Sequence, residues 1–267
     1  MPKIALVLGG GAARGFAHVG VIRTLEQEKI PIDLIVGTSV GSLIGAIYAD
    51  KQNSFDLEAI AFRLEKEDIF DFSVFSSSTG PVKGERLEQF VRQKISRQLI
   101  EDLPIPYAAV ATNLNTGEAV VLDRGSVARA VRASSSIPGV FTPVRNGDLL
   151  LVDGGVVNNV PVDVARAMGA DLIIAVNIGK DVINWEVSNI AEITLQAVNI
   201  MANEISSFKM RDADVLIEPQ VGSIGMMDFS KKEYGIRAGI SAAENAMPEI
   251  IKKIQAWQVK LGKRPVP

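Results

Sequence analysis

Ser39 is the residue whose neighbours best suit nucleophilic chemistry. It stands in Gly37-Thr38-Ser39-Val40-Gly41, a Gly-x-Ser-x-Gly pentapeptide. In hydrolases this pentapeptide places a serine on a tight strand-to-helix turn, with its hydroxyl exposed at the helix N-terminus. The two glycines would let the backbone make the turn and would keep side chains away from the nucleophile. The alternative is an ordinary glycine-rich turn whose serine caps the following helix.

A second glycine-rich segment, residues 9–15, follows a short apolar run and opens a helical pattern. Such a loop can bind a phosphate or donate backbone N–H groups to an oxyanion. A dinucleotide site would need a glycine at position 14 and an acidic residue at the end of the second strand. Position 14 is Arg14, and Asp33 precedes that strand instead of following it. The pattern therefore favours the oxyanion role over nucleotide binding.

The choice of base for a serine nucleophile is restricted because His18 is the single histidine. The α/β-hydrolase order requires a histidine after the serine, so that triad is excluded. His18 lies on the apolar face of its predicted helix, which favours a buried structural role. A carboxylate whose pKa is raised by burial can act as the base instead. Asp153 ends an apolar strand before Gly154-Gly155, which would allow an unusual backbone; the alternative is an aspartate in an ordinary turn.

The elements that position these residues alternate between strand and helix patterns. The chain opens with a strand at 4–8, the glycine loop, a helix at 16–28, a strand at 34–36, the serine turn and a helix at 40–49. Continuous apolar strands in this order are typical of an α/β domain with a parallel sheet. Further strands are expected at 108–111, 119–122, 149–152, 172–176 and 215–217, and helices at 126–134, within 187–210 and at 232–261. The Asn-Gly pair at 146–147 predicts a hairpin. We expect a single domain over 1–267.

Composition excludes several classes of protein. Apolar residues make up 47% of the 267 residues and charged residues 22%, which is typical of a packed globular core. The net charge of −3 lacks the basic footprint of a nucleic-acid-binding protein. Cysteine is absent, which excludes disulfides, thiolate catalysis and Cys-ligated zinc. The sequence shows neither a signal peptide nor an apolar run of ~18–20 residues, so we expect a cytoplasmic protein, with signal-independent export still compatible.

The three segments together resemble the signature of the patatin-like phospholipase family. The glycine loop at 9–15, the serine pentapeptide at 37–41 and Asp153-Gly154-Gly155 have that family's order and spacing. The segment at 132–141 also resembles the block before the aspartate in bacterial members. The resemblance covers about residues 4–220, and the helical tail at 232–261 is unspecific. The family loop is usually G-x-G-x-x-G, so this chain resembles a bacterial variant with one extra alanine before Arg14.

The resemblance implies a three-layer α/β/α fold and a metal-independent lipid acyl hydrolase, of phospholipase or esterase type, that needs no cofactor. By position, Ser39 would be the nucleophile and Asp153 the general base. The oxyanion hole would be formed by N–H groups of Gly10, Gly11 and Ala12, with Val40 as an additional donor. Because the loop is longer by one residue, the assignment of the oxyanion donors leaves a shift of one position open. The remaining glycines of the signature are Gly9, Gly15, Gly37, Gly41, Gly154 and Gly155.

Two further features keep alternatives open. Arg14 would contact a substrate phosphate or carboxylate, or would pair with a nearby carboxylate and orient the loop. The aromatic segment with Phe70, Phe72, Val74 and Phe75 would form an acyl-binding lip or an ordinary part of the core. The expected partner is a lipid or ester, with transient contact to a membrane surface and none to nucleic acid. The sequence assigns no head group, chain length or oligomeric state, and a regulatory or adaptor protein with weak hydrolase activity is the alternative function.

Overall fold

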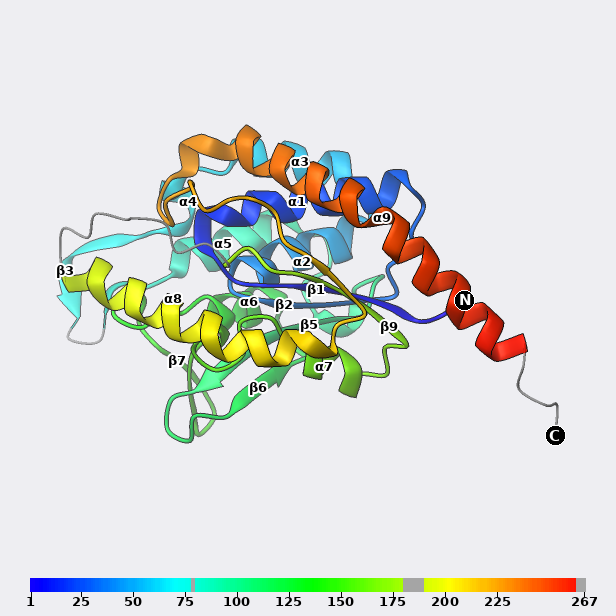
Figure 1. The fold of residues 1–267 in the computed structure, drawn as a ribbon. Helices are drawn as coiled ribbons and strands as arrows, with labels where there is room; N and C mark the ends of the chain where they lie inside the picture. Colours follow the sequence, from blue (N-terminus) through cyan, green and yellow to red (C-terminus); the bar gives the residue numbers. More distant parts are fainter. Residues whose placement is uncertain (78–79, 180–189, 263–267) are drawn as a thin grey trace.

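The computed structural model describes residues 1–77, 80–179 and 190–262, which are coloured in Figure 1. Side chains at 72–81, at several positions of 190–199 and at 260–262 are outside this description. Within the described ranges, a sheet of eight strands has the order β10-β9-β1-β2-β5-β8-β7, with β6 paired to β5. Its strands are β1 Ile4–Leu8, β2 Leu34–Thr38, β5 Tyr107–Asn113, β6 Ala119–Leu122, β7 Val144–Asn146, β8 Leu149–Asp153, β9 Leu172–Val176 and β10 Val215–Ile217. A second, two-stranded sheet pairs β3 (Phe72–Ser77) with β4 (Gly80–Val82).

The central sheet is parallel on one side and antiparallel on the other. The pairs β10–β9, β9–β1, β1–β2 and β2–β5 are parallel. The pairs β5–β8, β8–β7 and β5–β6 are antiparallel. The expected mostly parallel sheet is thus confirmed. The hairpin is confirmed too, because β7 ends at Asn146, β8 begins at Leu149 and Gly147 between them has a φ of +60°.

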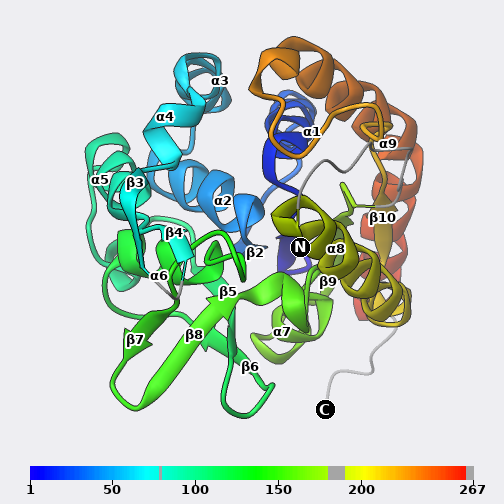
Figure 2. The same ribbon diagram turned by 90° about the vertical axis from the view of Figure 1, so that its left-hand side faces the viewer.

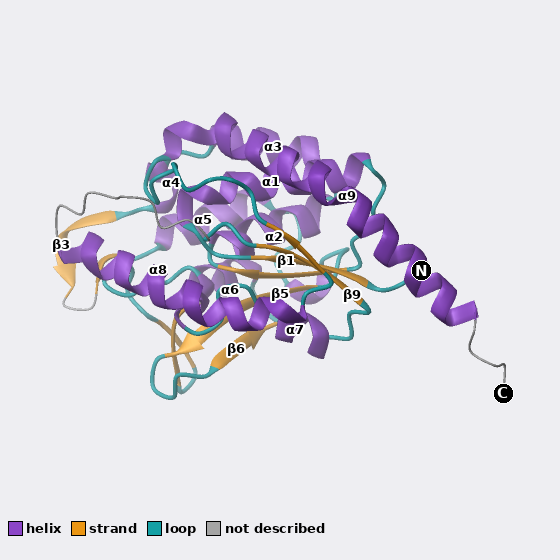
Figure 3. Ribbon diagram, viewed as in Figure 1, coloured by secondary structure: helices purple, strands orange, loops and turns teal. Residues whose placement is uncertain are grey.

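Helices cover both faces of the sheet and form the outer layers (Figures 1 and 3). The α-helices are α1 Phe16–Gln27, α2 Val40–Lys51, α3 Ser54–Arg63, α4 Lys66–Ile69, α5 Glu85–Lys94, α6 Val127–Ser134, α7 Val162–Ala167, α8 Ile190–Lys209 and α9 Lys232–Gly262. Alternate residues of β1 supply two cores: Ile4, Leu6 and Leu8 pack with α1, α2 and α9, whereas Ala5 and Val7 pack with α7. The expected three-layer α/β/α arrangement is confirmed.

The C-terminal helix α9 lies alongside α1 in the same layer (Figures 1 and 2). Their backbones approach so closely that a Cβ atom on Gly239 would stand 2.0 Å from the carbonyl oxygen of Ala17. A Cβ on Gly20 would likewise stand 2.0 Å from the oxygen of Ile236. Glycines at this crossing therefore let the last long segment pack against the first helix. No helix among the described residues is both long and apolar enough to cross a membrane.

The parallel strands direct the chemically interesting segments to one end of the sheet. Figure 2 looks onto the end toward which β1 runs. The glycine loop follows β1 and Ser39 follows β2, so both lie at that end. Asp153 reaches the same level from an antiparallel strand: Thr38 of β2 pairs with Val110 of β5, and the next residue of β5, Ala111, pairs with Asp153. β5 therefore lies between β2 and β8, and its register brings Asp153, at the end of β8, level with the serine turn that follows β2.

Candidate active site

Ser39 lies on a tight turn between β2 and α2, where the pentapeptide predicts it. Its own backbone is in a strained region, with φ +54° and ψ −125°, and it directly precedes α2 without a capping hydrogen bond from its side chain. The side chain of Ser134, at the end of α6, holds this turn: its Oγ accepts the Ser39 N–H at 2.9 Å and donates to the Val110 carbonyl at 2.6 Å. A buried hydroxyl from another element therefore stabilises the strained serine.

The glycines around Ser39 are required for a reason other than the one expected. The φ angles of Gly37 and Gly41 lie outside the left-handed region. A Cβ on Gly41 would instead stand 2.1 Å from the Leu8 oxygen, and a Cβ on Gly37 would stand 2.5 Å from the Gly41 oxygen. The strain is in Ser39, and the glycines let α2 begin directly against the ends of β1 and β2.

Asp153 is a buried carboxylate beside Ser39. It is 6% exposed and accepts the Gly155 N–H at 2.7 Å. Burial raises the pKa of Asp153 to about 6, although the Gly155 N–H and the nearby Ser39 hydroxyl both act to lower it. The carboxylate is thus ionised at neutral pH while being a stronger base than an exposed aspartate.

The Gly154-Gly155 pair also departs from its expected role. The φ angles of both glycines lie outside the left-handed region, so an unusual backbone conformation is not what requires them. A Cβ on Gly154 would stand 2.2 Å from the Val110 oxygen and 3.1 Å from Cγ2 of Thr38. Gly154 therefore lets the chain cross close over β5, which keeps Asp153 near the serine turn.

The glycine loop is fixed to its surroundings by most of its N–H groups. Gly9 donates to the oxygen of Val176 at 3.0 Å, Gly10 to Asn159 at 3.3 Å, Ala13 to Met226 at 3.0 Å and Arg14 to Gly11 at 3.1 Å. The N–H groups of Gly11 and Ala12 have no acceptor among the described residues. Of the three expected oxyanion donors, Gly10 is therefore engaged within the protein, and the N–H groups of Gly11 and Ala12 remain available.

Two pockets meet at Ser39. The first is apolar and is lined by Ala12, Ala13, Gly15, Phe16, Ser39, Val40, Leu43, Ile44, Leu64, Ile69, Phe70, Leu87, Ser135, Ile137, Phe141 and Phe229. The second is more polar and is lined by Gly10, Gly11, Ala12, Ser39, Ile137, Pro138, Asp153, Gly155, Val156, Asn159, Ala202 and Met226. The walls of both include Ser39, Ala12 and Ile137. Ser39 thus lies between an apolar pocket and one that is lined by Asp153 and the glycine loop.

Arg14 and His18 both support the loop from within the protein. Arg14 is buried and donates from Nε to the Ile224 carbonyl at 3.0 Å, outside the lining of both pockets. His18 is fully buried, and its Nε2 lies 2.7 Å from the Gly9 carbonyl oxygen. Burial lowers the pKa of His18 to about 4, so the ring is neutral and donates from Nε2. In the described part of the chain, no three His, Cys, Asp or Glu side chains gather as a metal site requires.

Phe70 combines the two roles expected for the aromatic segment. Its side chain is buried in a cluster with Val82 and Phe141 and also lines the apolar pocket. The side chains of Phe72, Val74 and Phe75 lie outside the described residues. The segment therefore supplies at least one residue both to the core and to the pocket wall.

Three residues at the site carried no individual signal in the sequence. Ser134 and Ile137 lie in the segment 132–141, which was noted only for its family resemblance, yet one binds Ser39 and the other lines both pockets. Asn159 lines the polar pocket and binds Gly10 through its backbone carbonyl and its side chain. Only its position shortly after the Asp153 motif could have drawn attention to it.

Comparisons with known proteins agree with this arrangement. The family model described as patatin-like phospholipase matches residues 6–166. An uncharacterized NTE family protein of Mycobacterium tuberculosis is 30% identical over 280 residues, covering 94% of this chain and 48% of that protein. The human patatin-like phospholipase domain-containing protein 6 is 40% identical over 188 residues, which is 66% of this chain and 13% of that protein. The chain thus spans about half or less of the length of these relatives.

Solved structures support the same fold. VipD from Legionella pneumophila superposes with a TM-score of 0.51 at 15% identity, over 92% of this chain and 67% of that chain. ExoU from Pseudomonas aeruginosa, in its complex with SpcU, gives a TM-score of 0.50 at 17% identity, over 95% of this chain and 53% of that chain. At such low identity these likenesses concern the fold alone. By its sequence match and its architecture, the chain belongs to the patatin-like phospholipase family.

Proposed function

We propose that this protein hydrolyses acyl esters of lipids with Ser39 as nucleophile and Asp153 as general base. The observation that carries the proposal is the position of Ser39 between two unlike pockets. The apolar pocket suits an acyl chain, and the polar pocket contains Asp153 and the available N–H groups of the glycine loop. Membership of the family supports lipid ester hydrolysis as the class of reaction.

The reaction would follow the two steps of covalent acyl transfer. The Ser39 oxygen attacks the acyl carbonyl carbon while the Asp153 carboxylate takes the hydroxyl proton. The carbonyl oxygen becomes an oxyanion that the N–H groups of Gly11 and Ala12 stabilise, with Val40 at the positive end of α2. Collapse expels the alcohol, which takes the proton from Asp153. Water then gives a proton to Asp153, attacks the acyl-enzyme and releases the acid, and Ser39 regains its proton.

The apolar pocket predicts a dependence on acyl chain length. Leu43, Ile44 and Leu87 are among its apolar wall residues, and each methylene buried there would contribute about 0.8 kcal/mol. Affinity should therefore rise with each added methylene until the chain fills the pocket. The polar pocket would take the leaving alcohol, because Asp153 must return a proton to its oxygen.

The test is an esterase assay with nitrophenyl esters of increasing chain length, together with labelling by a fluorophosphonate. Ser39→Ala should lower kcat/KM by at least about 10⁴-fold and should abolish labelling. Ser54→Ala is the matched control, because Ser54 is also a buried serine, lines neither pocket and donates its hydroxyl to Glu26 instead of to the serine turn. That variant should still be labelled at Ser39.

Two outcomes would contradict the proposal. One is a Ser39→Ala variant that keeps full activity, and the other is a label on a different residue. A wild-type chain that is folded, hydrolyses no ester in the series and takes no label would favour the regulatory or adaptor alternative.

A further inference from the structure

The direction of each N–H group in the glycine loop depends on what binds the carbonyl of the same peptide. A trans peptide points its C=O and N–H in opposite directions. The Gly11 N–H belongs to the peptide whose carbonyl is that of Gly10, and this carbonyl accepts a hydrogen bond from Nδ2 of Asn159 at 3.3 Å. The Ala12 N–H belongs to the next peptide, whose Gly11 carbonyl accepts the Arg14 N–H at 3.1 Å. A hydrogen bond to the carbonyl of each peptide therefore fixes the direction of its N–H group, which points the opposite way.

Asn159 binds Gly10 on both sides. Its side-chain amide donates to the Gly10 carbonyl, and its backbone carbonyl accepts the Gly10 N–H at 3.3 Å. The contact is close, since a Cβ on Gly10 would stand 2.5 Å from Oδ1 of Asn159. This reciprocal pair fixes the peptides before and after Gly10, although 149 residues separate the two partners in the chain.

From this geometry we infer that Asn159 is a positioning residue that holds the Gly11 N–H toward the oxyanion. Its catalytic consequence rests on the proposed function of Ser39, whereas its effect on the order of the loop does not. Asparagine suits the role because the side chain must donate to a carbonyl oxygen while it is 5% exposed. An aspartate of the same shape would place a carboxylate oxygen against that carbonyl and repel it.

His18 completes the support of the loop at its first peptide. Its neutral ring donates from Nε2 to the Gly9 carbonyl at 2.7 Å, and the N–H of the same peptide is the Gly10 group bound to Asn159. This peptide is therefore held at both ends. Within the described ranges, the Gly10–Gly11 peptide is held by its carbonyl alone, and that hydrogen bond comes from the Asn159 side chain. Removal of that side chain should release the peptide that carries an oxyanion donor.

The neighbouring Asn158 offers a matched control within the same segment. Its side chain is fully buried and donates from Nδ2 to Asp163 at 2.8 Å, on the α7 side. It stands outside the lining of both pockets. Two adjacent buried asparagines thus differ in their targets: one binds the glycine loop and the other binds α7.

The first measurement is hydrogen–deuterium exchange of the peptide that covers residues 9–15, read by mass spectrometry. Asn159→Ala should accelerate exchange there by about tenfold, because the loop loses a hydrogen bond that restrains it. Asn158→Ala should leave exchange over 9–15 at the wild-type rate and should lower only the melting temperature. Asn159→Asp keeps the side-chain shape and serves as the second variant, with an effect at least as large as that of Asn159→Ala.

The second measurement is kinetic, on a soluble short-chain nitrophenyl ester. Asn159→Ala should lower kcat by about 10–100-fold with KM within about threefold, since the N–H donors act mainly on the transition state. The Ki of an alkyl trifluoromethyl ketone, whose adduct with serine carries an oxyanion, should rise by the same factor as kcat falls. If Asn159 had only a structural role, the rise in Ki would not match the fall in kcat.

Unchanged exchange over 9–15 in both Asn159 variants would overturn the inference. So would an Asn158→Ala variant with the same loss of kcat, because the effect would then come from general packing of the segment. If the wild-type chain hydrolyses no ester, the proposed function fails, and the exchange comparison still decides whether Asn159 orders the loop.

Discussion

A buried aspartate lies near each end of helix α2, and the pKa values of the two carboxylates are shifted in opposite directions. Asp153 lies beside Ser39 at the N-terminal end, and burial raises its pKa to about 6. Asp50 lies in the last turn and is 4% exposed, yet its pKa is lowered. Burial alone therefore does not decide the direction in which the pKa of an aspartate shifts in this protein.

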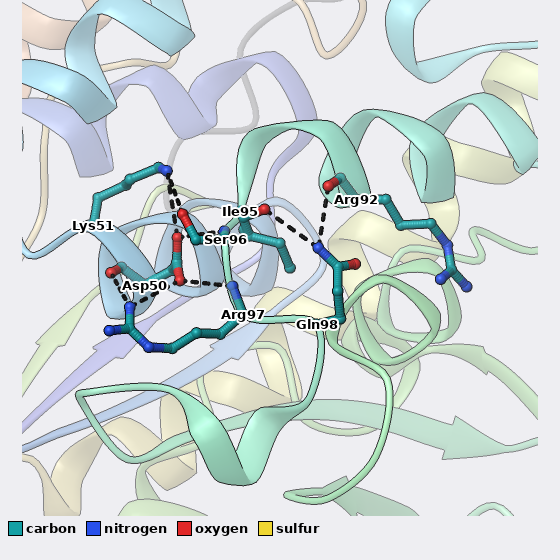
Figure 4. Close-up of polar contacts among 7 residues, drawn as sticks. All are labelled: Asp50, Lys51, Arg92, Ile95, Ser96, Arg97 and Gln98. Atoms are coloured by element: carbon teal, nitrogen blue, oxygen red, sulfur yellow. Dashed lines mark hydrogen bonds and ion pairs between the residues drawn. The ribbon is translucent and has the colours of Figure 1, made fainter.

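The two carboxylates differ in the donors and cations around them. Desolvation acts to raise both pKa values. At Asp50 the N–H groups of Ser96 (2.8 Å) and Arg97 (3.1 Å) outweigh it, helped by the cations of Lys51 (3.5 Å) and Arg97 (3.3 Å), as Figure 4 shows. Asp153 has one backbone donor, the Gly155 N–H, and the Ser39 hydroxyl lies near enough to lower its pKa. The several donors around Asp50 keep it ionised, which suits a structural role. The few donors around Asp153 leave its pKa near neutrality, which suits proton transfer.

The largest effect should come from Asp153→Asn. This change removes the proposed base and should lower kcat/KM by about 10³–10⁴-fold. It should also stabilise the fold at pH 8. Because the native pKa is about 6 and the unfolded pKa about 3.9, ionising the native carboxyl costs about 3 kcal/mol of stability above pH 6. Thermal unfolding of both proteins at pH 8 and pH 4 should show a gain of about 1–3 kcal/mol at pH 8 only.

The wild-type pH profile gives an independent check on Asp153. Its carboxylate must be ionised to accept a proton, so kcat/KM should fall about tenfold per pH unit below about pH 6. A flat profile down to pH 4.5, or an Asp153→Asn variant less stable than wild type at pH 8, would mean that this carboxylate resembles Asp50 after all.

The next largest effect should be on stability, from Asp50→Ala. The part-buried N–H groups of Ser96 and Arg97 would lose their acceptor, which should cost about 1–3 kcal/mol at pH 7. The sign with pH is opposite to that of Asp153. A lowered native pKa gives stability that is present above the unfolded pKa and is lost as pH falls through the native pKa. Urea unfolding at pH 7 and pH 3 should therefore show the difference from wild type shrinking in acid.

Activity separates the two aspartates further. Asp50→Ala, assayed well below its melting temperature, should keep kcat on a nitrophenyl ester, because Asp50 lies at the opposite end of α2 from Ser39. A loss of kcat comparable with that of Asp153→Asn would show that the anchor also sets the geometry of the serine turn, and the contrast between the two ends would fail.

Much of the fold can be predicted from local sequence, because the strands at 4–8, 172–176 and 215–217 are apolar runs bounded by polar residues or glycine. Their bounds match β1, β9 and β10. The two-stranded sheet of β3 and β4 was not predicted. Its segment reads as aromatic residues followed by serine, glycine and proline, with neither an Asn-Gly turn nor strict alternation to mark a hairpin.

The candidate site shows the same division between local and distant information. Residue type and spacing were enough to select Ser39 and Asp153 as the pair to examine. The partners that hold them were not accessible in this way, because Ser134 reaches Ser39 across 95 residues and Asn159 reaches Gly10 across 149. Such contacts depend on strand order and register, which a single sequence does not specify. The steric need for Gly41 against Leu8 is hidden for the same reason.

The smallest effect should come from Arg97→Ala, which divides the donor set of Asp50 into its parts. The substitution removes the guanidinium, whose side chain is 47% exposed, and keeps the Arg97 backbone N–H that binds the carboxylate. Solvent screens an exposed ion pair, so the loss should be about 0–1 kcal/mol in urea unfolding at pH 7. Lys51→Ala is the matched control, since its ammonium lies 3.5 Å from the same carboxylate.

If Arg97→Ala costs as much as Asp50→Ala, the cations hold Asp50 ionised. If both losses are small, the backbone donors do so, and Asp153 differs from Asp50 chiefly because its turn supplies one such donor where Asp50 has two.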